Sequence, residues 1–254
     1  MRCHGLPHLA YCDALAVEVG QLTDVVRGAD PDAPVPTCGA WTMSDLMRHT
    51  GQIHRWAASM VRDLSHTRLA QRERLFPGPS PAQLPEWIRE GGEETVGALR
   101  SAEPDATMWA WGADKHARFW ARRMLHETTM HRFDAELAVG ICPKPEPDVA
   151  VDGVDEFLEN LLCAAYFAPG VRRLRGAGEQ IVLAATDVDV SWTIQLARDG
   201  FTWRHGPDGG TVRVDGSAAD LYLFAWGRVR PGDPQLHITG DRALVDHWVA
   251  NSAL

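Results

Sequence analysis

The sequence has 254 residues, of which 45% are apolar and 23% are charged, and its formal net charge is −9. This composition is typical of a globular protein with one large domain or two of ordinary size. The acidic balance argues against nucleic-acid or anionic-membrane partners, because such partners need a basic surface.

Four amphipathic segments, separated by breaks rich in Pro and Gly, occupy the first half of the chain. Apolar residues recur at helical spacing in each segment, and the segments cover about residues 9–27, 43–64, 84–101 and 116–139. Thr42 and Asp45 fit a capping box at the start of the second segment, and Gly28 and Gly140 follow the first and fourth. Four such stripes predict a four-helix bundle, a fold that builds metal sites from inward-facing side chains.

In the second half of the chain the spacing of apolar residues changes. Residues 141–153 ("ICPKPEPDVAVDG") are the best candidate for a linker, and a helix is expected at about 152–167. Strands are expected at 180–186, 190–197, 199–206, 210–216 and 235–240, with helices at 217–227 and 241–251. We therefore expect two domains, a four-helix bundle at 1–148 and a small α/β domain at 149–254.

Neither the cysteines nor the apolar segments indicate export or membrane insertion. The five cysteines are scattered and form no C-x-x-C pair, which argues against a disulfide framework and favours reduced, mostly buried thiols. No segment approaches the run of about 20 apolar residues that spans a bilayer, and the N-terminus lacks the apolar block of a signal peptide. We expect a cytoplasmic protein, as a monomer or a small homo-oligomer.

Residues 125–136 ("LHETTMHRFDAE") look at first like the H-E-x-x-H helix of zinc proteases, but the spacing is one residue too long. A helix turns by about 100° per residue, so His126 and His131, five apart, point in different directions. Glu127 and His131 are four apart and share a face, and Asp134 falls on the same stripe. If a metal binds here, Glu127 and His131 are its ligands, and another segment must complete the site.

The segment 44–56 ("SDLMRHTGQIHRW") offers the other ligand. His49 lies within about half a turn of the centre of its apolar stripe, whereas His54 sits off that stripe. A hydrogen-bonded core histidine is the alternative for His49. A His–Glu–His set would leave the fourth position of a tetrahedral zinc open for water or a thiolate, whereas a fourth protein ligand such as Cys38 or His54 would indicate a structural site.

Two pairs of segments carry a resemblance to a known family. "WTMSDLMRHTGQIHRW" and "HETTMHRFDAELAVG", with the later "DGSAADLYLFAWGR" and "GDRALVDHW", resemble the mycothiol-dependent maleylpyruvate isomerase family of the DinB-like superfamily. The resemblance spans nearly the whole chain. It implies a DinB-like four-helix bundle and a sterol-carrier-protein-like C-terminal domain.

The resemblance also implies a site. One divalent metal, usually zinc, would be held by His49, Glu127 and His131, with Asp134 taking part in the active site beside it. Arg228 looks like an arginine that the C-terminal domain directs to the thiol cofactor, mycothiol. Asp134 could accept the thiol proton or orient His131; its alternative is a surface carboxylate paired with a residue such as Arg132.

The expected activity follows from thiol chemistry. Zinc would lower the pKa of the mycothiol thiol, and the thiolate would act on a small electrophilic substrate in a cis–trans isomerisation or an S-transfer. Two alternatives remain open at this point. One is a non-enzymatic, metal-stabilised protein that binds a small molecule or regulates another protein, and the other is a thiol-independent metal hydrolase or lyase.

Overall fold

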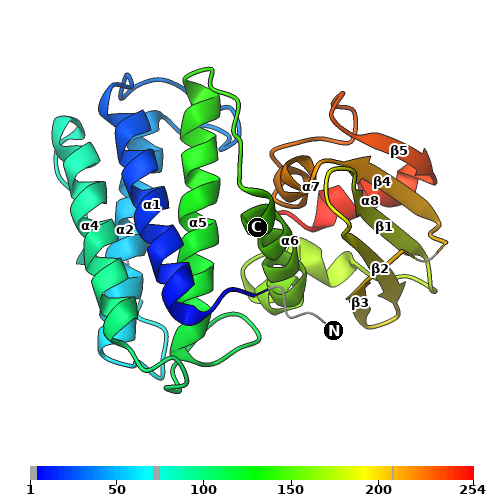
Figure 1. The fold of residues 1–254 in the computed structure, drawn as a ribbon, viewed down its shortest axis with the longest axis horizontal. Helices are drawn as coiled ribbons and strands as arrows, with labels where there is room; N and C mark the ends of the chain where they lie inside the picture. Colours follow the sequence, from blue (N-terminus) through cyan, green and yellow to red (C-terminus); the bar gives the residue numbers. More distant parts are fainter. Residues whose placement is uncertain (1–4, 71–74, 208) are drawn as a thin grey trace. The chain divides into compact units, whose positions relative to one another are not determined.

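The computed structural model describes residues 5–70, 75–207 and 209–254, and its first half is a bundle of long helices (Figure 1). The helices are α1 (His8–Arg27), α2 (Met43–Arg62), α4 (Leu84–Ser101) and α5 (Ala117–Ala138). Helices α1 and α2 each pack against both α4 and α5, so the four close into a ring around a shared core. The predicted four-helix bundle is confirmed.

Two adjacent glycines in α4 allow its close approach to the neighbouring helices. A Cβ atom on Gly92 would collide with the side chain of Val19 in α1, and one on Gly91 would collide with Arg55 in α2. Glycine inside a helix costs stability relative to alanine. Here that cost is offset because the missing side chains let three helices pack together.

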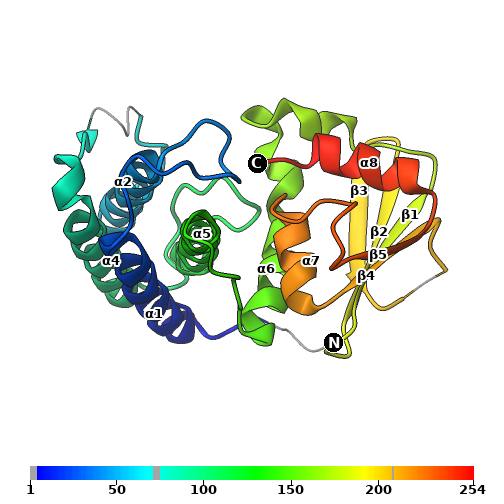
Figure 2. The same cartoon turned by 90° about the horizontal axis from the view of Figure 1, so that it is seen from above.

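The second half forms a mixed sheet with helices against it (Figure 2). The strands are β1 (Gln180–Ala185), β2 (Ser191–Ala197), β3 (Gly200–His205), β4 (Val212–Gly216) and β5 (His237–Gly240), in the order β3-β2-β1-β4-β5. The β1–β4 pair is parallel and the other neighbours are antiparallel. Helix α7 (Ala218–Ala225) packs against β1 and β4, and α8 (Arg242–Asn251) packs against β4. The small α/β domain is confirmed.

Helix α6 (Pro147–Asn160) departs most from its predicted bounds. This helix, which packs against α7, begins five residues before the predicted start at 152. Pro147 lies in the first turn, where the missing N–H has no helical partner to lose, so this proline begins the helix and is not part of the linker. The 3₁₀ helix η2 (Leu161–Tyr166) takes the place of the last part of the predicted helix, and a second 3₁₀ helix, η3 (Pro169–Arg173), follows it.

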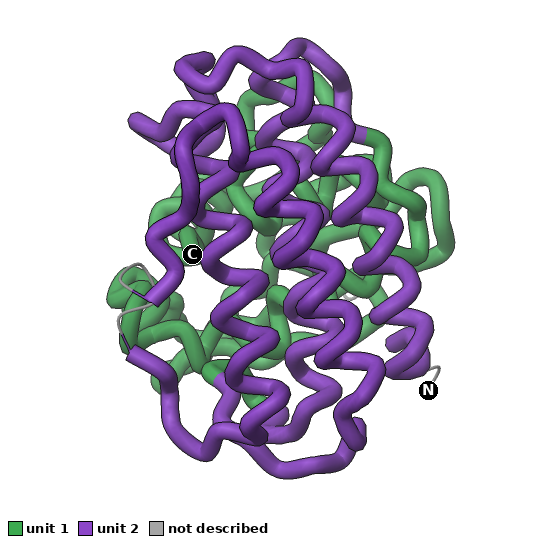
Figure 3. Tube along the Cα trace, turned by 90° about the vertical axis from the view of Figure 1, so that its left-hand side faces the viewer, with its two compact units in different colours: residues 1–4, 111–113, 144–254 green, residues 5–110, 114–143 purple. Residues whose placement is uncertain are grey.

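The chain divides into two compact units, coloured separately in Figure 3. One unit holds Gly5–Ala110 and Asp114–Pro143, and the other holds Trp111–Ala113 and Lys144–Leu254. The division after Pro143 falls inside the predicted linker, and the domain limits 1–148 and 149–254 remain predictions.

The described cysteines carry free thiols. Cys12 is buried, Cys38 and Cys163 are half-buried and Cys142 is exposed, so burial is less complete than predicted; Cys3 lies outside the described residues. Within the part of the chain that the structure describes, no helix has the length and apolarity needed to cross a membrane.

Candidate metal centre

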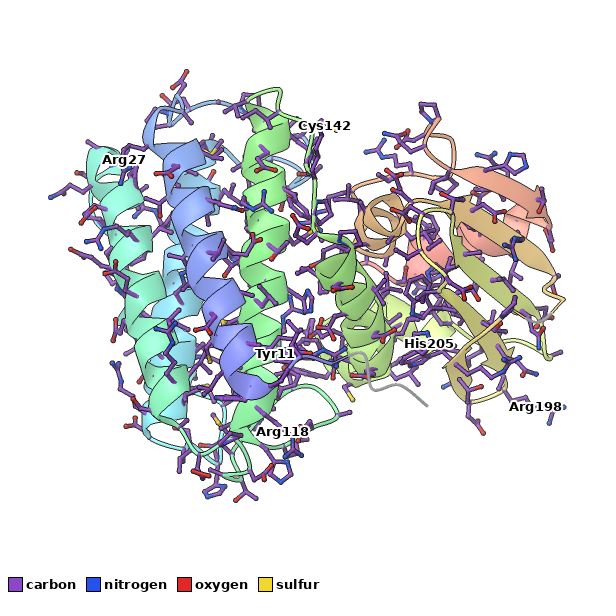
Figure 4. The ribbon with its side chains drawn as sticks, in the orientation of Figure 1. Tyr11, Arg27, Arg118, Cys142, Arg198 and His205 are labelled. Atoms are coloured by element: carbon purple, nitrogen blue, oxygen red, sulfur yellow. The ribbon has the colours of Figure 1, made fainter. Side chains whose placement is uncertain are left out.

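Two helices of the bundle carry the predicted metal ligands. Helix α2 starts with the predicted capping box: the Thr42 hydroxyl accepts from the backbone N–H of Asp45 at 3.3 Å, and the Asp45 carboxylate accepts from the backbone N–H of Thr42 at 2.9 Å. His49 lies about two turns into this helix. Helix α5 runs from near Arg118 at one end of the bundle towards Cys142 just past the other (Figure 4). It packs against α2 and carries Glu127 and His131 one turn apart.

The three side chains converge on one point. Nε2 of His49 and Nε2 of His131 each lie 3.3 Å from Oε1 of Glu127, and the three ligand atoms are all within 4.8 Å of one another. Tetrahedral zinc with bonds of about 2.0–2.1 Å places its ligand atoms roughly 3.3–3.4 Å apart. The His49 contact is also a hydrogen bond, longer than the usual 2.7–2.9 Å of a charge-assisted pair. The spacing therefore fits three ligands of a shared divalent ion.

Each of these side chains is oriented by a second contact. Arg123 donates from Nη2 to Oε2 of Glu127 at 3.2 Å, which leaves Oε1 directed at the two imidazoles. The ring of Trp41 lies 4.8 Å from the ring of His49 and 6.2 Å from that of His131, centroid to centroid. Contacts of this kind fix the geometry of metal ligands and tune their basicity.

The electrostatics of the site favour positive charge. Burial alone would raise the pKa of Glu127, but hydrogen bonds from His131 and His49 outweigh it and hold that pKa well below its usual value. Burial alone would lower the pKa of His131, but its contacts with Asp134, Cys38 and Glu127 outweigh burial and hold that pKa well above 6.5. A divalent cation would be stabilised by the same carboxylates, of which Glu127 is half-buried and Asp134 fully buried.

Asp134 lies behind His131 and is fully buried. Its Oδ2 is 3.0 Å from Nδ1 of His131, and its Oδ1 accepts from the Thr37 hydroxyl at 2.6 Å. An ionised carboxylate can only accept, so Nδ1 of His131 carries a proton, and Nε2 is the ring nitrogen that would give up its proton to bind a metal. The surface-carboxylate alternative is wrong, and Arg132 pairs with Glu18 and Glu136. Of the two active-site roles, these contacts favour orientation of His131.

The other candidate ligands lie elsewhere. His54 is fully buried, and its Nε2 is 2.8 Å from the hydroxyl of Thr128; His126 is also fully buried. Cys38 groups with Asp134 and His131, on the Nδ1 side of the imidazole. Among the described residues, no fourth Cys, His, Asp or Glu joins the set of His49, Glu127 and His131. This leaves a tetrahedral ion one position for an exogenous ligand.

Arg228 belongs to the C-terminal unit, three residues after the end of α7. It is half-buried, and its Nη1 donates to the carbonyl of Trp226 at 2.7 Å. Its part in thiol binding remains a prediction.

Three residues of the site were missed by the sequence analysis. Arg123 precedes Glu127 by four residues, so the same helical spacing that paired Glu127 with His131 could have found it. Thr37 and Trp41 lie in the irregular segment before α2, where no periodicity indicates which way a side chain points.

Comparisons with known proteins agree with this architecture. No curated protein matches the sequence. A crystal structure of the mycothiol-dependent maleylpyruvate isomerase aligns with a TM-score of 0.63 and 16% identity, over 92% of this chain and 93% of that one. A single-residue variant of that enzyme aligns with a TM-score of 0.64 and 15% identity over the same shares.

Two family models match the sequence itself. The mycothiol maleylpyruvate isomerase N-terminal domain matches residues 12–136, and the corresponding C-terminal domain matches residues 148–247. The first contains His49, Glu127 and His131, and the second contains Arg228. The chain therefore belongs to the mycothiol-dependent maleylpyruvate isomerase family.

Proposed function

We propose that this chain is a divalent-metal enzyme, with zinc as the first candidate metal, that uses mycothiol on a small electrophilic substrate. The observation that carries the proposal is the convergence of His49, Glu127 and His131 without a fourth described ligand. Catalytic zinc sites have three protein ligands and an open position, whereas structural sites are closed by four. The choice of mycothiol as the thiol rests on the family to which the chain belongs.

The bound ion would supply a Lewis acid that lowers the pKa of a thiol, so that the thiolate exists at neutral pH. The side chains prepare this role. Arg123 occupies Oε2 of Glu127 and so directs the single atom Oε1 towards the two imidazoles. Asp134 accepts from Nδ1 of His131, so Nε2 is the ring nitrogen that would bind the metal.

Two reactions use the same thiolate. His49, Glu127 and His131 would hold the ion that binds the thiolate, which would supply a nucleophile for a double bond or another electrophilic carbon. The product would be free of the thiol in a cis–trans isomerisation and would keep it in an S-transfer. Isomerisation is favoured by the family, and maleylpyruvate, named in the titles of the similar structures, is the first substrate to test. We place the enzyme in the cytoplasm, without nucleic-acid or membrane partners, in line with its net charge of −9.

A reaction screen tests the proposal. Zinc-loaded protein is incubated with mycothiol and a panel of electrophiles that includes maleylpyruvate, and the products are followed by mass spectrometry. We expect an isomer or a thiol adduct only when both metal and mycothiol are present. Turnover without mycothiol would instead indicate a metal hydrolase or lyase, and metal binding without any turnover would indicate a binding protein.

Metal content in variants tests the ligand set separately. His49→Ala, Glu127→Ala and His131→Ala should each lose most of the bound metal, because each removes one of three ligands. The matched control is His126→Gln on the same helix, which should keep the metal because His126 lies outside the ligand set. Full occupancy in His131→Ala by elemental analysis would refute the site.

A further inference from the structure

The turn that precedes α2 has a fixed shape. The backbone N–H of Val35 donates to the carbonyl of Trp41 at 2.9 Å, and that of Cys38 donates to the carbonyl of Val35 at 3.0 Å. Between them Gly39 has a φ of 66°, in the left-handed region that glycine adopts without strain. Cys38 and Trp41 also pack against the core cluster that contains Leu46. The turn is therefore anchored both to its own backbone and to the bundle.

The turn holds two consecutive side chains against Asp134. The hydroxyl of Thr37 donates to Oδ1 at 2.6 Å, and the thiol of Cys38 donates to Oδ2 at 3.3 Å. With Nδ1 of His131 at 3.0 Å from Oδ2, both carboxylate oxygens are occupied. A fully buried carboxylate is costly unless such donors satisfy it, so these contacts determine how the carboxylate lies.

We infer that Thr37 and Cys38 are positioning residues of the metal centre, acting on His131 through Asp134. One contact at Oδ2 would leave the carboxylate free to rotate about its Cβ–Cγ bond, whereas the hydroxyl at Oδ1 fixes its plane. A thiol is a weak donor, so Cys38 shares Oδ2 with His131 without displacing it. This inference rests on the metal site proposed above.

Three of these side chains have an alternative role as metal ligands. Cys38, His131 and Asp134 could themselves act as ligands, since their donor atoms also lie within 4.8 Å of one another. The 3.0 Å separation of Nδ1 and Oδ2 is that of an ordinary hydrogen bond and needs no bridging ion. A second equivalent of tightly bound metal that is lost in Cys38→Ala would overturn the positioning role.

Metal affinity of the full chain is the direct test. Metal-free wild type and variants are titrated with Co²⁺, read by its visible absorption, and with Zn²⁺ in competition with a chelator. Thr37→Val and Cys38→Ala should each weaken zinc binding by roughly tenfold and alter the Co²⁺ spectrum, as loss of outer contacts to a ligand does. Thr37→Ser and Cys38→Ser keep a donor and should stay close to wild type.

A double-mutant cycle separates positioning from general support of the fold. If Thr37 acts through Asp134, Thr37→Val should cause no further loss of affinity in an Asp134→Ala background. Unchanged affinity in both Thr37→Val and Cys38→Ala, or an undiminished effect in that background, would overturn the inference. A lower melting temperature of the metal-free variants with wild-type affinity would overturn it as well. Wild-type protein that binds no metal would refute the proposed function, and this inference with it.

Discussion

At the scale of single residues, His54 is a buried imidazole that stays uncharged although it lies near the candidate metal ligands. It is fully buried in α2, and its Nε2 lies 2.8 Å from the hydroxyl of Thr128. Burial lowers its pKa from 6.5 to about 4; Glu127 acts in the opposite direction, and Arg55 and His131 add to the lowering. The folded protein therefore holds this side chain neutral at neutral pH.

The neutral state of His54 makes stability sensitive to acid. An unfolded histidine titrates near 6.5. The contribution of neutral His54 to the free energy of unfolding is therefore complete above that pH and is lost as pH falls from 6.5 to about 4. The difference between the two pKa values corresponds to about 3 kcal/mol of unfolding free energy. His54→Gln cannot titrate, so metal-free protein carrying it should lose about 3 kcal/mol less stability than wild type between pH 7 and pH 4 in urea unfolding. Parallel pH profiles would show that His54 does not control this loss.

Residue spacing could predict the metal ligands and their partners on α5, but not the contacts that come from the turn before α2. Glu127 and His131 follow from a separation of four on one helix, which is a local property of the sequence. The contacts of Thr37 with Asp134 and of Trp41 with His131 join an irregular turn to residues far away in the chain. Such contacts depend on how the turn packs, and helical periodicity carries no information about that.

At the scale of elements, α4 offers a matched pair of glycine substitutions. A Cβ on Gly92 would collide with Val19 in α1, whereas one on Gly97 would meet nothing within 4 Å. Gly92→Ala should lower the unfolding free energy by about 1–3 kcal/mol, because it forces two packed helices apart. Gly97→Ala should raise it by up to about 1 kcal/mol, because alanine favours the helix. Chemical denaturation measures both, and equal effects would refute the close-packing role of Gly92.

The bundle helices were easier to predict than the element that follows them. The apolar stripes are strong in α2 and α4, and the Thr42–Asp45 capping box and Gly140 mark the start of α2 and the stop after α5. Helix α6 begins at Pro147 inside a segment whose other prolines indicate a linker. A proline at the first turn and a proline in a linker look alike until the following residues pack.

At the scale of the whole molecule, the central question is what the C-terminal unit contributes. We predict that Arg228→Ala in the full chain weakens mycothiol binding by about 2 kcal/mol, the range for hydrogen bonds to charged groups. Arg228→Lys should recover only part of this, because lysine lacks the planar fork of donors. The control is Arg230→Ala, which removes an exposed arginine from the same loop. Equal affinities of wild type and Arg228→Ala in calorimetry would exclude this role.

X-ray absorption at the zinc edge, recorded with and without mycothiol, tests the central claim most directly. Without mycothiol, the account predicts a zinc bound by two imidazoles and one carboxylate oxygen, with no sulfur ligand. With mycothiol, one sulfur should appear at about 2.3 Å, the usual zinc–thiolate distance. A sulfur ligand already present without mycothiol, or an unchanged spectrum after its addition at saturating concentration, would contradict a metal centre that opens one position to the thiol.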